Sequence, residues 1–133
     1  MPEPTNAASA PLRVLVVDAD DQIRESLARL LPIGGRCLVV GSAGEPDRAL
    51  DLASSMAPDV AVVDSRTPGL SSDWNFVHCL RSVAPDVRIV VLTWSDIDGC
   101  QAALPGADIY IRKTFRPQEL IDAVVNAARR TDA

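Results

Sequence analysis

The sequence predicts an α/β fold in which helices flank a doubly wound, five-stranded parallel sheet built as (βα)5. Short apolar runs recur along the chain with little alternation of polar residues, which is typical of strands covered on both faces. Segments with helical periodicity lie between these runs. Strands that alternate with helices form parallel sheets through right-handed crossovers. At 133 residues, the chain has the size of one domain with its own core.

The first strand and the first helix are predicted on either side of an acidic cluster. Residues 12–17 form an apolar run, and residues 18–21 follow it with three aspartates. The next segment has apolar residues at i, i+4, i+7 and i+8 and is closed by Pro32. This spacing predicts an amphipathic helix whose apolar face comprises Ile23, Leu27, Leu30 and Leu31.

The second unit and the central strand follow the same scheme. Residues 38–40 are predicted as a strand, residues 42–44 as a turn and residues 46–56 as a helix that begins with proline. The run 60–63 is apolar without a break, which predicts a strand buried on both faces. It delivers the carboxylate of Asp64 into the turn that follows.

The remaining elements are a helix, a strand, a short segment, a strand and a final helix. Asp73 or a neighbouring serine is expected to cap a helix over about residues 72–84. The segment between the last two strands leaves room for only a short helix. The predicted strands are 87–92 and 109–111, the short segment is 95–105, and the final helix starts at Pro117 and ends near residue 130.

The composition indicates a single cytoplasmic domain over residues 12–130, with loose tails at 1–11 and 131–133. The net charge of −5 argues against nucleic acid as a direct partner, and no apolar run approaches the length of a membrane span. The three cysteines have no CxxC spacing, and only one histidine could join them, so a reduced protein without zinc is the simplest interpretation.

Four polar side chains follow the predicted buried strands. Asp18 comes after the first strand, Asp64 after the third, Thr93 after the fourth and Lys113 after the fifth. A doubly wound sheet brings these ends to one edge, where ligands bind. Two nearby carboxylates call for a cation between them, such as Mg²⁺, and the amine and hydroxyl suit phosphoryl oxygens. An aspartate can also act as a nucleophile that carries a phosphoryl group.

These strand ends resemble those of a known family. The chain resembles the response-regulator receiver domain, which has the flavodoxin-like fold of CheY, over residues 12–130. The motifs that carry the resemblance are Val14–Asp18, Pro58–Asp64 with Pro68-Gly69, Val90–Thr93 and Gly106–Lys113.

The resemblance implies a signalling module and not an enzyme: a stand-alone receiver in a two-component phosphorelay. Asp64 would accept a phosphoryl group from a histidine kinase, and Lys113 would contact that group. Asp18, Asp64 and the backbone carbonyl of Arg66 would hold Mg²⁺.

The resemblance also implies how the signal leaves the domain. Thr93 and Tyr110 would form a switch pair that changes the face built by residues 95–105, residues 109–111 and the final helix. No DNA-binding or enzymatic segment follows residue 130, so output is expected through a protein partner. A homodimer on the same face is one form of such a contact.

Among the departures from the family pattern, two concern the pocket. Receivers usually have two adjacent acids after the first strand, but the second position here is Ala19, so Mg²⁺ binding is expected to be weak unless Asp20 or Asp21 supplies the ligand. Trp94 stands where the family normally has a small residue beside the pocket. Its ring could gate access to Asp64, or it could point outward as an anchor for a partner.

Two alternative functions therefore stay open. The first is a degenerate receiver that binds proteins without phosphorylation. The second is a phosphatase of the haloacid-dehalogenase type, in which Asp18 would be the nucleophile and Asp20 the acid/base. The phosphatase interpretation gives Asp64 no role. It also requires a further pair of acids downstream, which the sequence does not show.

Overall fold

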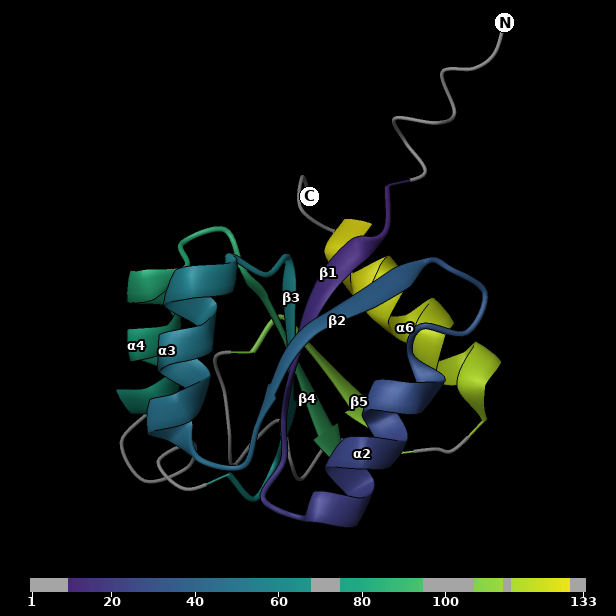
Figure 1. Ribbon diagram of the computed structural model, residues 1–133, viewed down its shortest axis with the longest axis horizontal. Coiled ribbons are helices and arrows are strands. Elements are labelled where there is room, and N and C mark those ends of the chain that lie inside the picture. Colours follow the sequence, from purple (N-terminus) through teal and green to yellow (C-terminus); the bar gives the residue numbers. More distant parts are fainter. Residues whose placement is uncertain (1–9, 68–74, 95–106, 114–115, 130–133) are drawn as a thin grey trace, which may run out of the picture.

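The chain folds around one parallel sheet with the strand order β2-β1-β3-β4-β5 (Figure 1). The computed structural model describes residues 10–67, 75–94, 107–113 and 116–129. The predicted five-stranded, doubly wound sheet is confirmed. Its elements are β1 (Leu12–Val17), α2 (Asp21–Leu30), β2 (Cys37–Ala43), α3 (Pro46–Met56), β3 (Val60–Asp64), α4 (Asn75–Val83), β4 (Arg88–Thr93), β5 (Ile109–Arg112) and α6 (Pro117–Arg129).

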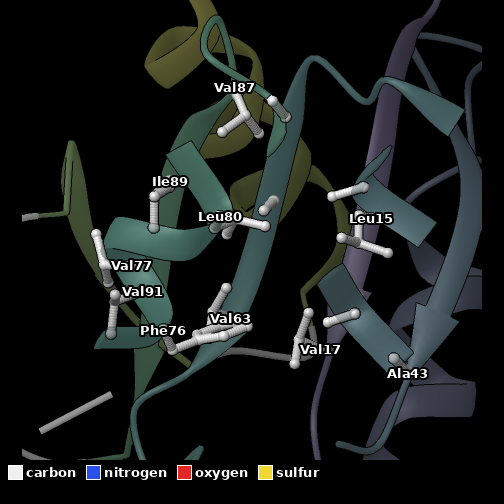
Figure 2. Close-up of a cluster of buried hydrophobic side chains, with 14 residues drawn as sticks. Leu15, Val17, Ala43, Val63, Phe76, Val77, Leu80, Val87, Ile89 and Val91 are labelled. Carbon is white, nitrogen blue, oxygen red and sulfur yellow. The ribbon is translucent and has the colours of Figure 1, made fainter. Parts of the chain in front are cut away.

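The sheet separates two buried cores. Helices α3 and α4 cover one face, where side chains such as Leu15, Val63 and Leu80 pack together (Figure 2). Helices α2 and α6 cover the other face, where Leu27 and Leu120 pack against the remaining strand residues (Figure 1). Successive residues of a strand point to opposite faces, so burial on both sides requires an unbroken apolar run, as the sequence shows.

Local signals in the sequence set the ends of the first two helices. The side chain of Asp20 accepts hydrogen bonds from the backbone N–H groups of Gln22 and Ile23, which caps the N-terminus of α2. Pro46 occupies the first turn of α3, where its missing N–H costs nothing. Helix α3 ends at Met56 and is capped by Ala57, which adopts a left-handed conformation with φ 48°.

The second strand is longer than predicted, and residues 42 and 43 belong to it and not to a turn. Strand β2 pairs with β1 from Leu12↔Cys37 to Val17↔Ala43. A shift of register between Val14 and Leu15 accommodates one extra residue in β2. Because backbone pairing along β1 extends the strand, Gly41 and Ser42 are included although their types do not favour strands.

Three polar residues predicted to follow strands are instead the last residues of those strands. Asp64 ends β3 and pairs with Leu92, while Thr93 ends β4 and pairs with Arg112 at the end of β5. The fourth strand begins at Arg88, one residue later than predicted. The hydrogen-bonded backbone therefore holds the polar side chains at the sheet edge more firmly than a loop would.

Several expectations lie outside the described residues. They are the two tails apart from residues 10 and 11, the turn at Pro68-Gly69, the cap of the third predicted helix at Asp73, and the short helix within 95–105. Within the described ranges, no helix combines the length and the apolar character that a membrane crossing requires.

Candidate functional site

Four buried polar side chains lie at the carboxyl ends of neighbouring strands. Asp18 follows β1, Asp64 ends β3, Thr93 ends β4 and Lys113 follows β5. None of the four is more than 8% exposed. The order of strands reverses between β1 and β3, and this is the place where open α/β sheets bind ligands. The structure thus brings together the residues that the sequence placed at the strand ends.

Lys113 lies between the two aspartates. Its Nζ is 3.0 Å from Asp18 Oδ2, to which it donates a hydrogen bond, and 2.7 Å from Asp64 Oδ1. The second contact is an ion pair without hydrogen-bond geometry, and among the described residues Asp64 Oδ1 has no hydrogen-bond partner. The ammonium group of Lys113 thus lies between the two carboxylates, and among the described residues one buried acceptor has no hydrogen bond.

A tight turn fixes Asp64 and the two residues after it. Both the backbone N–H and the hydroxyl of Thr67 donate to the Asp64 carbonyl, at 3.0 and 2.7 Å. Ser65 N–H donates to the Leu92 carbonyl of the adjacent strand. The turn brings the side chain of Arg66 back over Asp64, where Nε lies 3.3 Å from Oδ2. Each carboxylate oxygen of Asp64 thus faces a different cation.

The loop after β1 is held by Arg24. Its Nη1 donates to the Asp18 carbonyl at 2.8 Å, while Nη2 contacts the carboxylate of Asp21. Asp18 Oδ1 accepts from the backbone N–H of Asp20 at 2.9 Å. At Gly44, a Cβ would come within 2.8 Å of Arg24 Nη1, so the guanidinium occupies the space that a side chain would need.

The two alternative metal ligands, Asp20 and Asp21, have partners on α2. The carboxylate of Asp20 caps the helix, and that of Asp21 pairs with Arg24. Both residues are exposed, in contrast to Asp18, and so is Ala19 at the position of the missing acid. A ligand role for Asp20 or Asp21 would require their carboxylates to leave these contacts, and it stays a prediction.

Trp94 lies beside the buried lysine. Its ring centroid is 5.2 Å from Lys113 Nζ, a cation–π distance, while the residue remains 43% exposed. The ring thus has one face toward the ammonium and part of its surface toward solvent. This arrangement suits the gate expected from the sequence without excluding contact with a partner.

The proposed switch residues, Thr93 and Tyr110, occupy neighbouring strands. Thr93 is buried, and its carbonyl accepts from Lys113 N–H at 2.7 Å. Tyr110 is partly buried against the core of α3 and α4, and its hydroxyl accepts from the Ala107 N–H at 3.2 Å. Their role in switching stays a prediction.

The oxygen atoms at this edge of the sheet are of the type that binds a hard cation. The carboxylates of Asp18 and Asp64 supply oxygen ligands, and Asp64 Oδ1 is a buried acceptor without a hydrogen bond. Within the described residues, no group of three or more acidic, histidine or cysteine side chains converges. The residues therefore suit Mg²⁺ chemically, with few anionic ligands.

Comparison with known proteins identifies the family. Residues 14–125 match the family model of the response regulator receiver domain. The chain belongs to the response-regulator receiver family. Receivers are signalling modules of two-component systems, which interact with histidine kinases and other proteins. The resemblance inferred from the strand ends is thus confirmed at the level of family and fold.

Curated relatives and solved structures agree with this assignment. The chain is 38% identical over 126 residues to the response regulator MprA of Mycolicibacterium vanbaalenii, covering 91% of this receiver and 52% of that protein. It is 32% identical over 131 residues to the nitrate/nitrite response regulator protein NarP of Escherichia coli, covering 97% and 58%. The receiver thus spans little more than half the length of these relatives.

The solved structures show the same fold. A receiver domain protein from Clostridium thermocellum is 27% identical with a TM-score of 0.70, covering 90% of this chain and 95% of the other. A two-component response regulator of the LuxR family from Aurantimonas is 25% identical with a TM-score of 0.74, covering 90% and 86%.

Two features of the site were missed in the sequence. Arg66 was considered only for its carbonyl, and Thr67 was not considered. A hydroxyl residue three positions after a strand-end aspartate favours a side chain-to-backbone turn, which was an available signal for Thr67. The direction of the Arg66 side chain depends on that turn and could not be read from residue spacing.

Proposed function

We propose that this receiver accepts a phosphoryl group on Asp64 from a histidine kinase and signals through protein contacts. The supporting observation is the buried ion pair between Asp64 Oδ1 and Lys113 Nζ at 2.7 Å, next to Asp18. A nucleophilic carboxylate and a cation suited to a phosphoryl oxygen are paired at the ligand-binding edge of the sheet.

The transfer is a displacement at phosphorus. An oxygen of the Asp64 carboxylate forms a bond to phosphorus while the bond from phosphorus to the donor nitrogen or oxygen breaks, and the donor leaves with that electron pair. Lys113 then pairs with a phosphoryl oxygen in place of Asp64 Oδ1. Thr93 lies at the end of the neighbouring strand, where its hydroxyl can donate to another phosphoryl oxygen and couple the event to Tyr110.

Asp18, Asp64 and the carbonyl of Arg66 would hold Mg²⁺, which when bound would neutralise the charge of the phosphoryl group. Since Ala19 stands in place of one acid, we expect weak binding of the metal. Asp18 also holds Lys113 at 3.0 Å, and through this contact it keeps the ammonium beside the reacting carboxylate.

The output surface would comprise β5, α6 and the segment before β5. Strand β5 is an edge strand with partly exposed side chains, so a change in Tyr110 can be sensed by a partner or by a second receiver. The net charge of −5 argues against direct binding of nucleic acid. A reducing cytoplasm would suit the thiols of Cys37 and Cys79.

Mass spectrometry after incubation with acetyl phosphate and Mg²⁺ tests the proposal. The wild-type receiver is expected to gain about 80 Da, and Asp64→Asn is expected to gain nothing. Asp59→Asn provides a matched control because Asp59 is exposed and lies at the other end of β3. A gain that persists in Asp64→Asn would place the chemistry at another residue.

A phosphorylation-independent binding module remains the second candidate. It is favoured by Ala19 and by the closed state of the pocket, in which Asp64 is only 3% exposed. On this alternative, neither acetyl phosphate nor a kinase would modify the protein. The phosphatase alternative gains no support, because the carboxylate that would act as its acid/base, that of Asp20, caps α2.

A further inference from the structure

We propose that the side chain of Arg66 captures the phosphoryl group of the donor at the mouth of the pocket and holds it for transfer to Asp64. This inference rests on the proposed function of Asp64 and assigns a phosphate-binding role to the side chain of a residue whose backbone carbonyl is the expected metal ligand. The class of ligand is the phosphoryl group of an acyl phosphate or a phosphohistidine.

The two cations at Asp64 differ in exposure. The Lys113 side chain is 3% exposed and contacts both aspartates, whereas the Arg66 side chain is 63% exposed. Lys113 is thus enclosed on the protein side of the carboxylate, and Arg66 reaches it from the solvent side. An incoming phosphoryl group approaches from solvent, so it meets the guanidinium of Arg66 before it meets the ammonium of Lys113.

The contact between Arg66 and Asp64 is suited to exchange. At 3.3 Å it is longer than the 2.7 Å contact of Lys113 with the same carboxylate, and the Arg66 side chain is largely exposed, so solvent and incoming ligands can reach the guanidinium. A guanidinium has five N–H donors in a planar fork that matches the oxygens of a phosphate, and Nε alone contacts Asp64 here. The other donors can bind phosphoryl oxygens while Nε stays near the nucleophile.

The backbone around Arg66 is held firmly. The two hydrogen bonds from Thr67 to the Asp64 carbonyl close the turn, and Thr67 itself is buried. The base of the Arg66 side chain is therefore fixed relative to the nucleophile. By contrast, Arg24 has both terminal nitrogens engaged, on the Asp18 carbonyl and on Asp21.

Charge balance supports the same role. The carboxylates of Asp18 and Asp64 carry two negative charges, which Lys113 and Arg66 balance with two positive charges. A phosphoryl group adds negative charge at Asp64, and Ala19 provides no further carboxylate with which a metal could be recruited. A second cation at the mouth of the pocket therefore compensates part of the added charge.

The test compares wild type, Arg66→Gln, Arg66→Lys and the control Arg29→Gln, which makes the same charge change at an exposed position of α2. The rate of phosphorylation by acetyl phosphate is measured by mass spectrometry at several salt concentrations. Arg66→Gln should lower the second-order rate constant by about tenfold or more and weaken its salt dependence. Arg66→Lys should keep the salt dependence and recover only part of the rate, and Arg29→Gln should match wild type.

Binding of beryllium fluoride, a phosphoryl mimic, provides a second readout by ¹⁹F NMR. Weaker binding by Arg66→Gln than by wild type supports the inference even where acetyl phosphate transfers slowly. Equal rates and equal binding in wild type and Arg66→Gln would overturn the inference and leave Asp64 as the phosphoacceptor. If wild type neither gains mass nor binds beryllium fluoride, the proposed function and the role of Arg66 both fail.

Discussion

The indole ring of Trp94 lies over the ammonium group of Lys113, which in turn contacts Asp64 Oδ1. In the proposed phosphorylation of Asp64, Lys113 would exchange this contact for a phosphoryl oxygen. The ring stabilises the ammonium in its resting place through a cation–π interaction, and as the hypothesised gate it would also restrict access to the carboxylate. Both effects oppose phosphorylation, so Trp94 would act as a gate.

Substitution of Trp94 by alanine distinguishes two hypotheses, that the ring gates access to Asp64 and that it anchors a partner protein. A cation–π contact contributes about 0.5–2 kcal/mol, so its loss should speed phosphorylation by acetyl phosphate between about twofold and thirtyfold. Mass spectrometry follows the rate, with Ile33→Ala as the control at another exposed apolar side chain. An anchor would instead leave the rate unchanged and cost about 2 kcal/mol or more in binding of a partner.

The residues that meet at the pocket were predictable because each one ends or follows a buried strand. Asp18, Asp64, Thr93 and Lys113 could be placed at one edge from the apolar runs alone. Their contacts could not be predicted, because the direction of a long side chain depends on neighbours from other strands. The position of Lys113 between two carboxylates is such a contact, although the need for a cation there was clear.

At the scale of single elements, β2 shows where the sequence signal was weak. The central strands are buried on both faces and have unbroken apolar runs, whereas β2 lies at the edge of the sheet with Leu38 and Ser42 exposed. Its length is determined by pairing with β1, including the register shift at Val14 and Leu15. Because this pairing uses backbone groups, the residue types alone do not predict how long the strand is.

Helix α6 is tied to the segment before β2 by an ion pair. Asp122 Oδ1 accepts from Arg36 Nη1 at 2.7 Å and from Gln118 Nε2 at 3.0 Å. The hydrogen bond from Arg36 is the main cause that lowers the pKa of Asp122 below its ordinary 3.8. In the unfolded chain this bond is absent, so the unfolded state binds the proton more readily.

The stabilisation from Asp122 should therefore be present above pH 3.8 and be lost as the pH falls through the lower pKa of the folded state. At neutral pH, Asp122→Asn is expected to unfold at a slightly lower urea concentration than wild type. The difference should shrink on acidification and vanish below the folded-state pKa. Arg36→Gln should show the same pH dependence, and a difference that persists at acid pH would assign it to another cause.

At the scale of the whole molecule, the sheet acts as a partition between two cores. Leu80 of α4 lies in one core and Leu120 of α6 in the other, and both are fully buried. The strands that separate them have side chains on both faces, and within the described part of the chain the two leucines belong to separate clusters of buried residues. Packing defects in the two cores should then lower the free energy of unfolding independently of each other.

Urea unfolding of Leu80→Ala, Leu120→Ala and the double variant tests this partition. Each substitution should lower the free energy of unfolding by about 2–5 kcal/mol, since it leaves a cavity in a closed core. The effects should add to within about 0.5 kcal/mol. A coupling above about 1 kcal/mol would mean that the strands transmit strain between the cores.

The contact between Arg24 and Gly44 links the loop after β1 to the end of β2. A Cβ at position 44 would lie 2.8 Å from Arg24 Nη1, so a side chain there would require the flexible end of Arg24 to shift on the Asp18 carbonyl. With arginine at position 24, a side chain at position 44 would disturb this hydrogen bond, whereas a shorter residue at position 24 would leave the space open. Natural variation at these two positions should therefore be correlated, with each residue's tolerance set by the other.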